Sequence, residues 1–341
     1  MDLAEFDYEL PQELIAQAPL PDRAASRMLV VDRARQRWED RRFRDLPDFL
    51  SPGDCLVLND SRVFPARLFG RRAGVNASGA VEVLLLHPVD GGAKVWDALV
   101  HPGKKMRVGE IVRFTGDLEA EVIARGEFGE RTLRFRTDHD VYDEIEKIGH
   151  VPLPPYIKRQ DEAADRERYQ TVFARERGSA AAPTAGLHFT PAVLDECRAR
   201  GAGIALVTLH VGLGTFQSLH TERLEGHRLH AEHFRITAEN AALMAAARRR
   251  VAVGTTSVRT VESAMLSGGL RESSGDTDLF IYPGFEFRAT GAMLTNFHLP
   301  RTSLLLLVCA FAGKQLALDA YRHAVSERYR FYSYGDCMLI V

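Results

Sequence analysis

The chain has 341 residues, of which 45% are hydrophobic and 26% are charged, a composition typical of a globular protein long enough for two or more cores. This balance excludes disordered and fibrous proteins. The net charge of −2 gives no overall signal of nucleic-acid binding. The four cysteines are widely spaced and form no CxxC pair, so neither a disulfide framework nor a zinc knuckle is indicated.

No targeting or membrane segment is expected. Acidic residues stand at positions 2, 5, 7 and 9, where a secretory signal would have basic and then apolar residues. The longest apolar run, residues 304–312, has nine residues, which is too few to span a bilayer. The sequence therefore predicts a cytoplasmic protein without a membrane partner.

Arginines are concentrated near the N-terminus. Eight of them lie between Arg23 and Arg44, and Arg62, Arg67, Arg71 and Arg72 follow closely. Such a stripe can neutralise phosphates, but a solvated protein face has the same composition. The charge pattern alone leaves both interpretations open.

The first 150 residues divide into two regions of different texture. Short apolar runs predict strands at residues 28–31 and 55–58, and the second ends in the polar cluster Asn59-Asp60-Ser61-Arg62, which suits either a ligand or a plain Asx turn. From residue 63 to about 150 the chain has short alternating runs separated by glycine. Five or six strands of this length make a small barrel, so residues 63–150 are predicted to form an inserted all-β barrel domain.

The remaining residues predict an alternation of strands and helices. Three prolines at positions 152, 154 and 155 exclude a helix and mark the return from the insert. This alternation implies an α/β fold, with a largely parallel sheet and helices on both faces, in a discontinuous main domain of residues 1–62 and 151–341. Helices are expected at 191–200, 238–250, 255–266, 302–312 and 316–328, and strands at 204–209, 251–253, 278–282 and 338–341.

Residues 181–190, Ala-Ala-Pro-Thr-Ala-Gly-Leu-His-Phe-Thr, have the composition of a binding site. Thr184 and His188 supply a hydroxyl and an imidazole, and Gly186 permits backbone angles or a ligand approach that a side chain would block. Thr190-Pro191 predicts an N-cap followed by the first residue of a helix. The alternative is a tight loop with a structural histidine.

Four polar or glycine-bearing loops follow predicted strands, at residues 184–189, 210–216, 254–259 and 296–300. Because the carboxyl ends of strands form the ligand crevice of an open α/β sheet, we expect these loops to converge. The loop from His210 to Thr215 lacks the third glycine and the immediate helix of a dinucleotide fingerprint. Gly254-Thr-Thr-Ser has no P-loop lysine, but its donors at a helix start would suit an amino-acid carboxylate.

Histidines are dense between positions 210 and 233, where Glu232 lies among five of them. The spacing of three at positions 227, 230 and 233 can place two rings on one helical face, but no cysteine or carboxylate set completes a tetrahedral metal site. General acid–base catalysis suits one or two of these rings better, because imidazole titrates near neutrality. A structural role is the alternative for each single histidine.

Eight sequence blocks, taken in order, resemble the S-adenosylmethionine:tRNA ribosyltransferase-isomerase family of queuosine biosynthesis. The resemblance runs nearly from end to end of the chain. The blocks are Asn59–Arg67, Pro152–Ile157, Ala181–Phe189, Leu209–Gln217, Ala252–Arg259, Phe280–Phe285, Leu294–Pro300 and Tyr329–Asp336.

The resemblance implies an activity and its partners. The ribosyl part of S-adenosylmethionine would be transferred and isomerised onto preQ1 at the wobble position of tRNA, giving epoxyqueuosine-tRNA, adenine and methionine. S-adenosylmethionine would be a consumed substrate, so no cofactor and no metal are expected. The family's discontinuous α/β domain with an inserted β-barrel agrees with the change of texture at Val63.

The resemblance also guides the choice of site residues. We expect His188, His210, Glu232 and His298 to share the proton transfers, and Arg62, Arg67 and Arg71 to contact tRNA. Alternatives from other classes are an RNA-binding or structural protein with an inert α/β part, and a metal-dependent hydrolase built on the histidines. The expected substrate-binding residues are Thr184, Gly186, Phe189, Gly212, Gly214, Thr215, Phe216, Gly254, Thr255, Thr256, Arg259 and Asn296.

Overall fold

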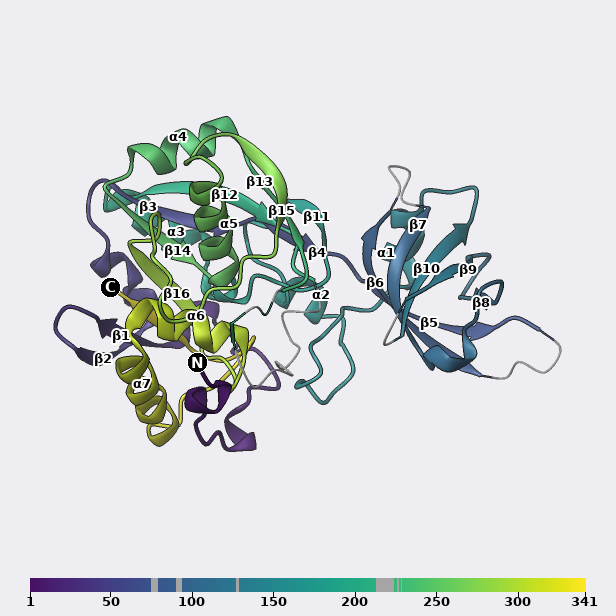
Figure 1. Cartoon of the computed structure of the whole chain (residues 1–341), viewed down its shortest axis with the longest axis horizontal. Helices are drawn as coiled ribbons and strands as arrows, with labels where there is room; N and C mark the ends of the chain where they lie inside the picture. The colour runs from purple at the N-terminus through teal and green to yellow at the C-terminus, as the bar shows by residue number, and fades with distance from the viewer. Residues whose placement is uncertain (75–78, 90–93, 127–128, 213–223, 226, 228) are drawn as a thin grey trace.

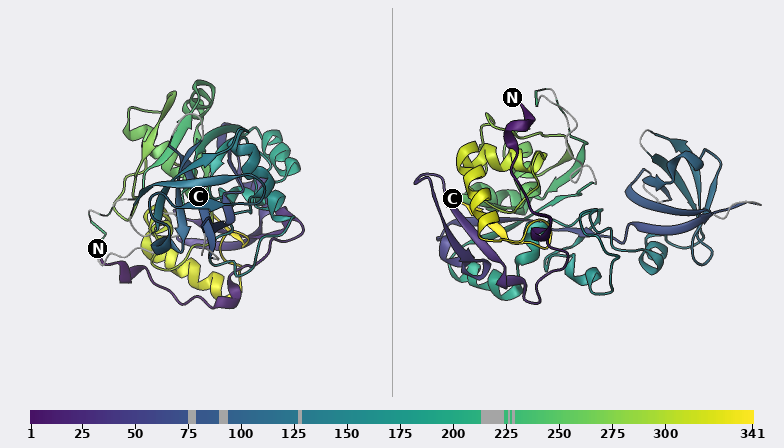
Figure 2. Two further views of the ribbon diagram at one scale, coloured as in Figure 1. Left: turned by 90° about the vertical axis from the view of Figure 1, so that its right-hand side faces the viewer. Right: turned by 90° about the horizontal axis from the view of Figure 1, so that it is seen from below.

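The computed structural model describes residues 1–74, 79–89, 94–126, 129–212, 224–225, 227 and 229–341. Two bodies are visible in Figure 1: a main body built on a nine-stranded sheet, and a closed six-stranded barrel that stands to one side of it. The right-hand view of Figure 2 shows the same separation, with the two chain termini on the main body.

The main sheet is mixed. Its four adjacent central strands β12, β3, β14 and β16 are parallel, whereas β13, β15, β2 and the β16–β17 pair are antiparallel to their neighbours. The expectation of a largely parallel sheet is therefore wrong in detail, although the α/β class holds. In sheet order the strands are β15 Ser273–Thr277, β13 Glu232–Ile236, β12 Gly203–Leu209, β3 Asp54–Asn59, β14 Arg249–Val253, β16 Ala292–Asn296, β17 Cys337–Ile340, β1 Arg27–Asp32 and β2 Arg37–Arg42.

The antiparallel strands have a simple physical origin. β1 and β2 are separated by only the four residues 33–36, and so short a connection can join strands only as an antiparallel hairpin. Every residue of β2 is exposed except half-buried Trp38, so its sequence lacks the apolar run that identified the central strands. β13 and β15 are likewise partly exposed strands at the opposite edge.

Helices cover both faces of the sheet, as predicted. Alternate residues of β3 point to opposite faces: Cys55 and Val57 pack with α4 and α5, and Leu56 and Leu58 pack with α3. α6 and α7 pack on the α5 face through the apolar cluster that contains Met293. The helices are α3 Pro191–Ala199, α4 Ala238–Ala246, α5 Thr255–Leu266, α6 Ser303–Ala312 and α7 Lys314–Ser326, which confirms the five predicted helices, although α4 ends earlier because β14 begins at Arg249.

The predicted barrel is confirmed as a closed antiparallel barrel. Its strand order is β10-β7-β6-β5-β8-β9, and its interior is filled by buried apolar side chains that include fully buried Trp96. Helix α1 (Val141–Ile148) packs on this core through Val141 and Ile145. The strands are β5 Arg67–Arg72, β6 Ala80–Pro88, β7 Val95–His101, β8 Ile111–Arg113, β9 Glu119–Arg125 and β10 Glu130–Arg136, all within the predicted insert of residues 63–150.

Two further strands and several short helices complete the connections. β4 (Ser61–Val63) leads toward the barrel and pairs in parallel with β11 (Glu176–Ser179) on the returning chain. The other short helices are α2 Asp165–Arg168 and the 3-10 turns η1 Leu3–Phe6, η2 Gln12–Leu14, η3 Arg23–Ala25, η4 Phe43–Phe49, η5 Gly103–Lys105 and η6 Thr184–His188.

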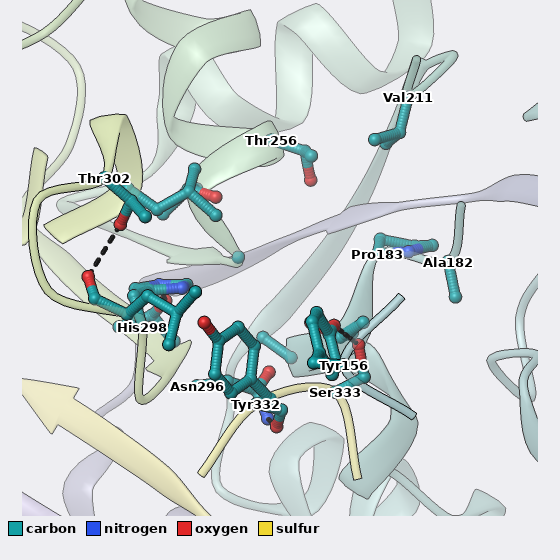
Figure 3. A pocket seen from close by; sticks show the side chains of 17 residues that line it. Tyr156, Ala182, Pro183, Val211, Thr256, Asn296, His298, Thr302, Tyr332 and Ser333 are labelled. Atoms are coloured by element: carbon teal, nitrogen blue, oxygen red, sulfur yellow. Dashed lines mark hydrogen bonds between the residues drawn. The ribbon is translucent and has the colours of Figure 1, made fainter. Parts of the chain in front are cut away.

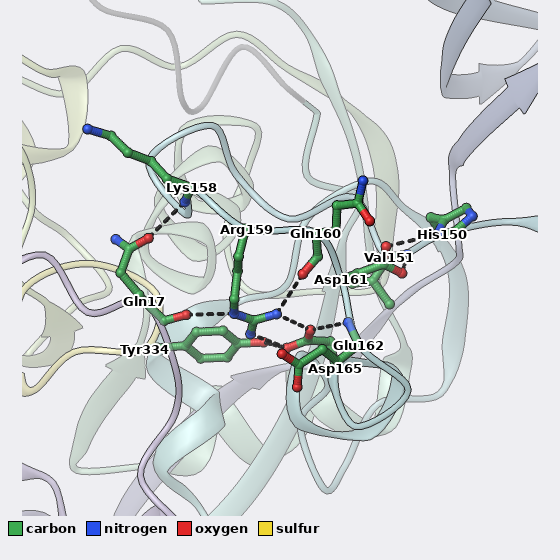
Figure 4. A network of polar contacts seen from close by, with 10 residues as sticks. All are labelled: Gln17, His150, Val151, Lys158, Arg159, Gln160, Asp161, Glu162, Asp165 and Tyr334. Atoms are coloured by element: carbon green, nitrogen blue, oxygen red, sulfur yellow. Dashed lines mark hydrogen bonds and ion pairs between the residues drawn. The ribbon is translucent and has the colours of Figure 1, made fainter.

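The segment that returns from the barrel is fastened to the main body by a polar network (Figure 4). The three prolines prevent a helix at residues 151–157, as predicted. Beyond them, Arg159 forms two hydrogen bonds with Asp165, at 2.6 and 2.8 Å, and the Tyr334 hydroxyl donates to the same carboxylate at 2.7 Å. Burial raises the pKa of Asp165, but its hydrogen bonds, led by that of Arg159, outweigh burial and hold the pKa below its usual value.

The strand expected at residues 278–282 is wrong. β15 ends at Thr277, whose hydroxyl accepts a hydrogen bond from the Leu279 amide at 3.2 Å, and the chain then continues without sheet pairing. The apolar residues that suggested a strand, Leu279 to Tyr282, pack instead against the core cluster under α6 and α7.

Among the described residues, no single helix has the length and apolar composition needed to cross a membrane. The bent pair α6 and α7, with 116° between its helices, meets that test by length and composition only.

Candidate active site

The predicted convergence of loops is confirmed for the described residues. Because β12, β14 and β16 run parallel, the segments that follow them leave the sheet at one edge, and all three line one pocket with residues 182–185. We call this the inner pocket (Figure 3). Its lining comprises Tyr156, Ala182–Ala185, Val211, Gly254–Thr256, Thr295, Asn296, His298, Leu299, Thr302, Leu304, Tyr332 and Ser333.

A wider cleft opens beside the inner pocket, between the barrel and the main body. The barrel contributes residues of β6, β7, β9 and β10, and the main body contributes His210, Gly212, Glu232 and Arg259. Val211 and Leu304 line both spaces, so the inner pocket and the cleft adjoin. The expected site residues that line a described pocket are thus divided between two neighbouring spaces.

Glu232 is held rigidly at the main-body wall of the cleft. Arg259, on α5, donates to its Oε2, and the Gly212 amide donates to its Oε1 at 2.9 Å. The Arg259 guanidinium also donates to the carbonyls of Thr277 and Leu279, at 3.2 and 3.1 Å. Arg259 was expected to bind substrate, and the structure shows it holding the carboxylate in place.

His210 lines the cleft, and its backbone amide donates to the carbonyl of His233, the residue after Glu232 on β13, at 3.0 Å. Its ring packs over Gly178, where an added Cβ would lie 3.1 Å from Cε1 of the imidazole. Its Nδ1 is buried and has no hydrogen-bond partner among the described residues. Burial, together with His233, lowers the pKa of His210, so its ring is neutral at neutral pH and can accept a proton.

His298 faces the inner pocket from the end of β16. Its Nε2 lies 2.7 Å from the Thr295 hydroxyl, and its backbone amide is hydrogen-bonded to the buried Tyr321 hydroxyl. Burial lowers the pKa of His298 to about 3, which keeps the ring neutral.

His188 is buried behind the inner pocket and does not line it. The amide of Asn296 donates to its Nε2 at 3.2 Å, so Nδ1 carries the proton and donates to the Ser26 hydroxyl at 2.9 Å. Burial lowers the pKa of His188 to about 3. The structure therefore places this ring as a support for Asn296, which does line the pocket.

The rest of the 181–190 stretch is divided in the same way. Thr184 lines the inner pocket, and Thr190 caps helix α3 with Pro191 at its first turn, as predicted. Phe189 is fully buried in the core under α3, and Gly186 is in contact with Phe173 and Thr171, which leave no room for a side chain. Neither of these two lines a described pocket.

Gly254, Thr255 and Thr256 form the N-terminus of α5 at the inner pocket. Gly254 has a φ of 87°, a conformation that favours glycine, and no side chain caps the helix. The free amide groups of a helix start attract an anion. Gly214, Thr215 and Phe216, also expected to bind substrate, lie outside the described residues.

Within the described chain, no group of three or more histidine, cysteine, aspartate or glutamate side chains is arranged to hold a metal ion. His233 is on strand β13 and not on a helix, and its Nδ1 lies 2.9 Å from Asp276. The helical spacing considered for these histidines therefore does not apply to it.

Comparison with known proteins shows the family to which the chain belongs. A family model described as queuosine biosynthesis protein matches residues 3–340. Two relatives are S-adenosylmethionine:tRNA ribosyltransferase-isomerases. The protein from Solibacter usitatus (strain Ellin6076) is 67% identical, and the match covers all of this chain and 100% of the relative. The protein from Azoarcus sp. (strain BH72) is 52% identical, and the match covers all of this chain and 97% of the relative. The chain belongs to this family.

A solved structure supports the same assignment. The crystal structure of S-adenosylmethionine tRNA ribosyltransferase from Thermotoga maritima is 40% identical, and the match covers 99% of this chain and 100% of that one with a TM-score of 0.56. The resemblance noted in the sequence is thus confirmed over the whole chain.

Some pocket residues of this ribosyltransferase-isomerase family member were not expected from its sequence. Tyr156 and Tyr332 lie in the inner pocket with ring centroids 3.9 Å apart, and the Tyr156 hydroxyl is 2.5 Å from that of Ser333. Both tyrosines fall in blocks that carried the resemblance, Pro152–Ile157 and Tyr329–Asp336. For Tyr332, the available signal was the run of aromatic and polar residues that follows the last helix without strand alternation.

The cluster Asn59-Asp60-Ser61-Arg62 is structural in its first three residues. Asn59 accepts from the Ser61 amide at 3.1 Å, an Asx turn, and Asp60 accepts from the Thr208 hydroxyl at 2.7 Å. Arg62 and Arg71 are exposed, whereas Arg67 is paired with Glu82 at 3.1 Å. Neither described pocket includes any of these residues.

The arginine stripe between residues 23 and 44 is engaged mainly within the protein. Arg23 donates to the carbonyls of Glu167, Gln170 and Leu187. Arg33 donates to the carbonyls of Gly291, Phe311 and Val341. Five others of the stripe, Arg27, Arg35, Arg41, Arg42 and Arg44, pair with carboxylates or donate to backbone carbonyls. These contacts favour the structural interpretation over phosphate binding.

Proposed function

We propose that the protein transfers and isomerises the ribosyl moiety of S-adenosylmethionine onto preQ1 at the wobble position of tRNA, giving epoxyqueuosine-tRNA, adenine and methionine. The observation that carries the proposal is the adjacency of the inner pocket and the cleft, which share Val211 and Leu304. One space suits a small molecule, and the other, open between the two bodies, suits a nucleotide turned out of a tRNA loop.

The first chemical step needs a base beside the sulfonium. A proton must leave the ribose carbon next to sulfur, whose positive charge stabilises the carbanion. His210 suits this role, because its ring is neutral and lies where the two spaces meet through its neighbour Val211. Its Nδ1 has no hydrogen-bond partner among the residues that the structure describes.

Glu232 assists by electrostatics. Its carboxylate, fixed by Arg259 and Gly212, places an oriented charge near the sulfonium and the developing charges of the sugar. Adenine is then expelled, the preQ1 amine joins the sugar fragment, and methionine leaves as the epoxide forms. His298 faces the inner pocket as a second candidate for proton transfer, and Thr184, Thr255 and Thr256 are placed to hydrogen-bond the small molecule.

S-adenosylmethionine is both activating group and substrate in this scheme, so the proposal includes no cofactor or metal. The proposed partners are tRNA carrying preQ1 and S-adenosylmethionine. Arg62 is exposed on the connection between the two bodies, and Arg71 is exposed on the barrel. We propose that both contact the tRNA backbone, together with Arg67, which lies between them in the sequence.

The test is incubation of the purified protein with preQ1-bearing tRNA and S-adenosylmethionine, with adenine release followed by chromatography. Adenine release that requires both substrates is the expected result. Binding of tRNA without adenine release would indicate an RNA-binding protein instead, and an activity that disappears on removal of a tightly bound metal would contradict the proposed chemistry.

A further inference from the structure

The inner pocket contains three buried polar atoms without a hydrogen-bond partner in the described part of the chain. They are Oγ1 of Thr256, Oδ1 of Asn296 and the hydroxyl of Tyr332, on side chains that are 8%, 2% and 9% exposed. Buried polar groups are nearly always paired, so three unpaired atoms around one space indicate a polar ligand.

The orientation of two of these atoms is fixed by the surrounding structure. The Asn296 amide nitrogen donates to the Tyr332 carbonyl at 3.1 Å and to His188, which leaves Oδ1 as an acceptor. Tyr332 has a φ of 73°, which is unfavourable for a residue with a side chain, and its amide donates to the Phe297 carbonyl at 3.1 Å. Strained backbone of this kind persists where the neighbouring structure holds it, often at functional sites.

The opposite side of the pocket supplies donors and a positive end. Thr255 and Thr256 are the first residues of the twelve-residue helix α5, which no side chain caps. In Figure 3, Thr256 lies on one side of the cavity, and Asn296 and Tyr332 lie on the other. Apolar side chains, among them Val211, Leu299 and Leu304, line the space with them.

We propose that the inner pocket binds the amino-acid part of S-adenosylmethionine, with its carboxylate at the N-terminus of α5 and the Thr256 hydroxyl, and its ammonium at Asn296 Oδ1 and the Tyr332 oxygen. The apolar walls contact the methylene chain. This assignment rests on the proposed function. It extends that function by naming Tyr332 as a substrate-binding residue and by giving the substrate a direction.

The direction is consistent with the chemistry. With the amino acid in the inner pocket, the sulfonium lies toward the close, tilted rings of Tyr156 and Tyr332, since aromatic faces attract a cation. The ribose then extends past Val211 and Leu304 into the cleft, where His210 and Glu232 lie. An adenine base suits the pocket less well, because it has no negative charge for the helix start.

The experiment compares two ligands across isosteric variants. Tyr332→Phe and Thr256→Val each remove one unpaired hydroxyl and keep the shape of the side chain. The matched control is Thr171→Val. It removes a buried hydroxyl that has no hydrogen-bond partner in the described part of the chain and lines neither pocket. Binding of S-adenosylmethionine, and of the 5′-dimethylsulfonium analogue of adenosine that lacks the amino acid, is measured by calorimetry.

Each pocket variant is expected to bind S-adenosylmethionine about tenfold more weakly, because it loses a hydrogen bond to a charged group, and to bind the analogue as the wild type does. Thr171→Val is expected to leave both affinities unchanged. Equal losses for the two ligands, or no loss for either, would overturn the inference. Failure of the proposed function would differ, since the wild type itself would then bind no S-adenosylmethionine and release no adenine.

Discussion

Arg259 on α5 donates a hydrogen bond to Glu232 on the strand β13, and both side chains are at least nine-tenths buried. The pair joins a helix, a strand near the sheet edge and, through the Gly212 amide, the loop that follows β12. A buried ion pair of this kind contributes little net stability, but removal of one partner leaves a buried charge without compensation. The geometry therefore ties the position of the proposed catalytic carboxylate to the integrity of this part of the sheet.

Arg259→Met is expected to lower the free energy of unfolding by roughly 3–5 kcal/mol, because Glu232 is left charged and buried. Urea denaturation at neutral pH measures the change. Arg113→Met is the control, since Arg113 pairs with Glu119 at 2.7 Å but its side chain is 66% exposed, and a loss of about 1 kcal/mol or less is expected there. Equal losses of unfolding free energy in the two variants would show that the buried pair matters no more to stability than the exposed pair.

Stability is expected to depend on pH through His188. The folded ring has a pKa of about 3, and an unfolded histidine titrates near 6.5, so the unfolded state binds more protons between these values. The contribution is complete above about pH 6.5 and is lost as the pH falls, by up to about 1.4 kcal/mol per pH unit. His188→Gln should be less stable but less sensitive to pH between about 7 and 5 in urea titrations. An unchanged slope would contradict the prediction.

The sequence predicted the parts of this fold that depend on local pattern. Alternating apolar residues with glycine turns gave the barrel, and helical periodicity with caps such as Thr190 gave the five helices. Charged edge strands such as β2 were not predicted, because their exposed residues carry no apolar pattern. The run that starts at Leu279 was wrongly predicted to be a strand, because burial against helices requires apolar residues as much as burial in a sheet does.

The site was predicted to the level of loops and less well to the level of side chains. The order of strands brings Thr184, Gly254 and Asn296 together, as expected from strand ends in an α/β sheet. The direction of each side chain within a loop depends on tertiary contacts, so His188 turned inward to Ser26 and Asn296, and Tyr332 turned into the pocket. No sequence pattern specifies these choices.

Gly186→Ala is expected to destabilise the protein and to leave ligand binding by the folded fraction intact. An added Cβ would lie 2.8 Å from atoms of both Thr171 and Phe173, and overpacking of this kind costs about 1–3 kcal/mol. Gly275→Ala is the control, because apart from its chain neighbours no atom of the described residues lies within 4 Å of its added Cβ, and a change below about 0.5 kcal/mol is expected. Denaturant titrations compare the two. Loss of S-adenosylmethionine affinity without loss of stability would instead place Gly186 at the ligand.

His210→Gln is expected to lower kcat for adenine release by about 100-fold or more, as loss of a general base does. In the wild type, burial and His233 lower the pKa of His210, so activity should fall only as the pH drops below the ordinary imidazole value of 6.5. His233→Gln removes the neighbouring ring and should shift the acidic side of the pH–activity profile to higher pH, because the pKa of His210 rises. Stopped-time assays across the pH range measure both. A profile that does not shift in His233→Gln would argue against His210 as the base.

Arg62→Ala is expected to weaken tRNA binding and to reduce the slope of log affinity against log salt by about one, as loss of one phosphate contact does. Arg62 is exposed on β4, on the connection between the two bodies, whereas Arg37 is exposed on β2, at the far edge of the main sheet from the barrel (Figure 1). Arg37→Ala is therefore the matched control, with unchanged affinity and slope. Filter binding at several salt concentrations makes the comparison. If the two variants lose affinity equally, the tRNA does not distinguish the connection from the far edge, and the proposed contact at Arg62 is wrong.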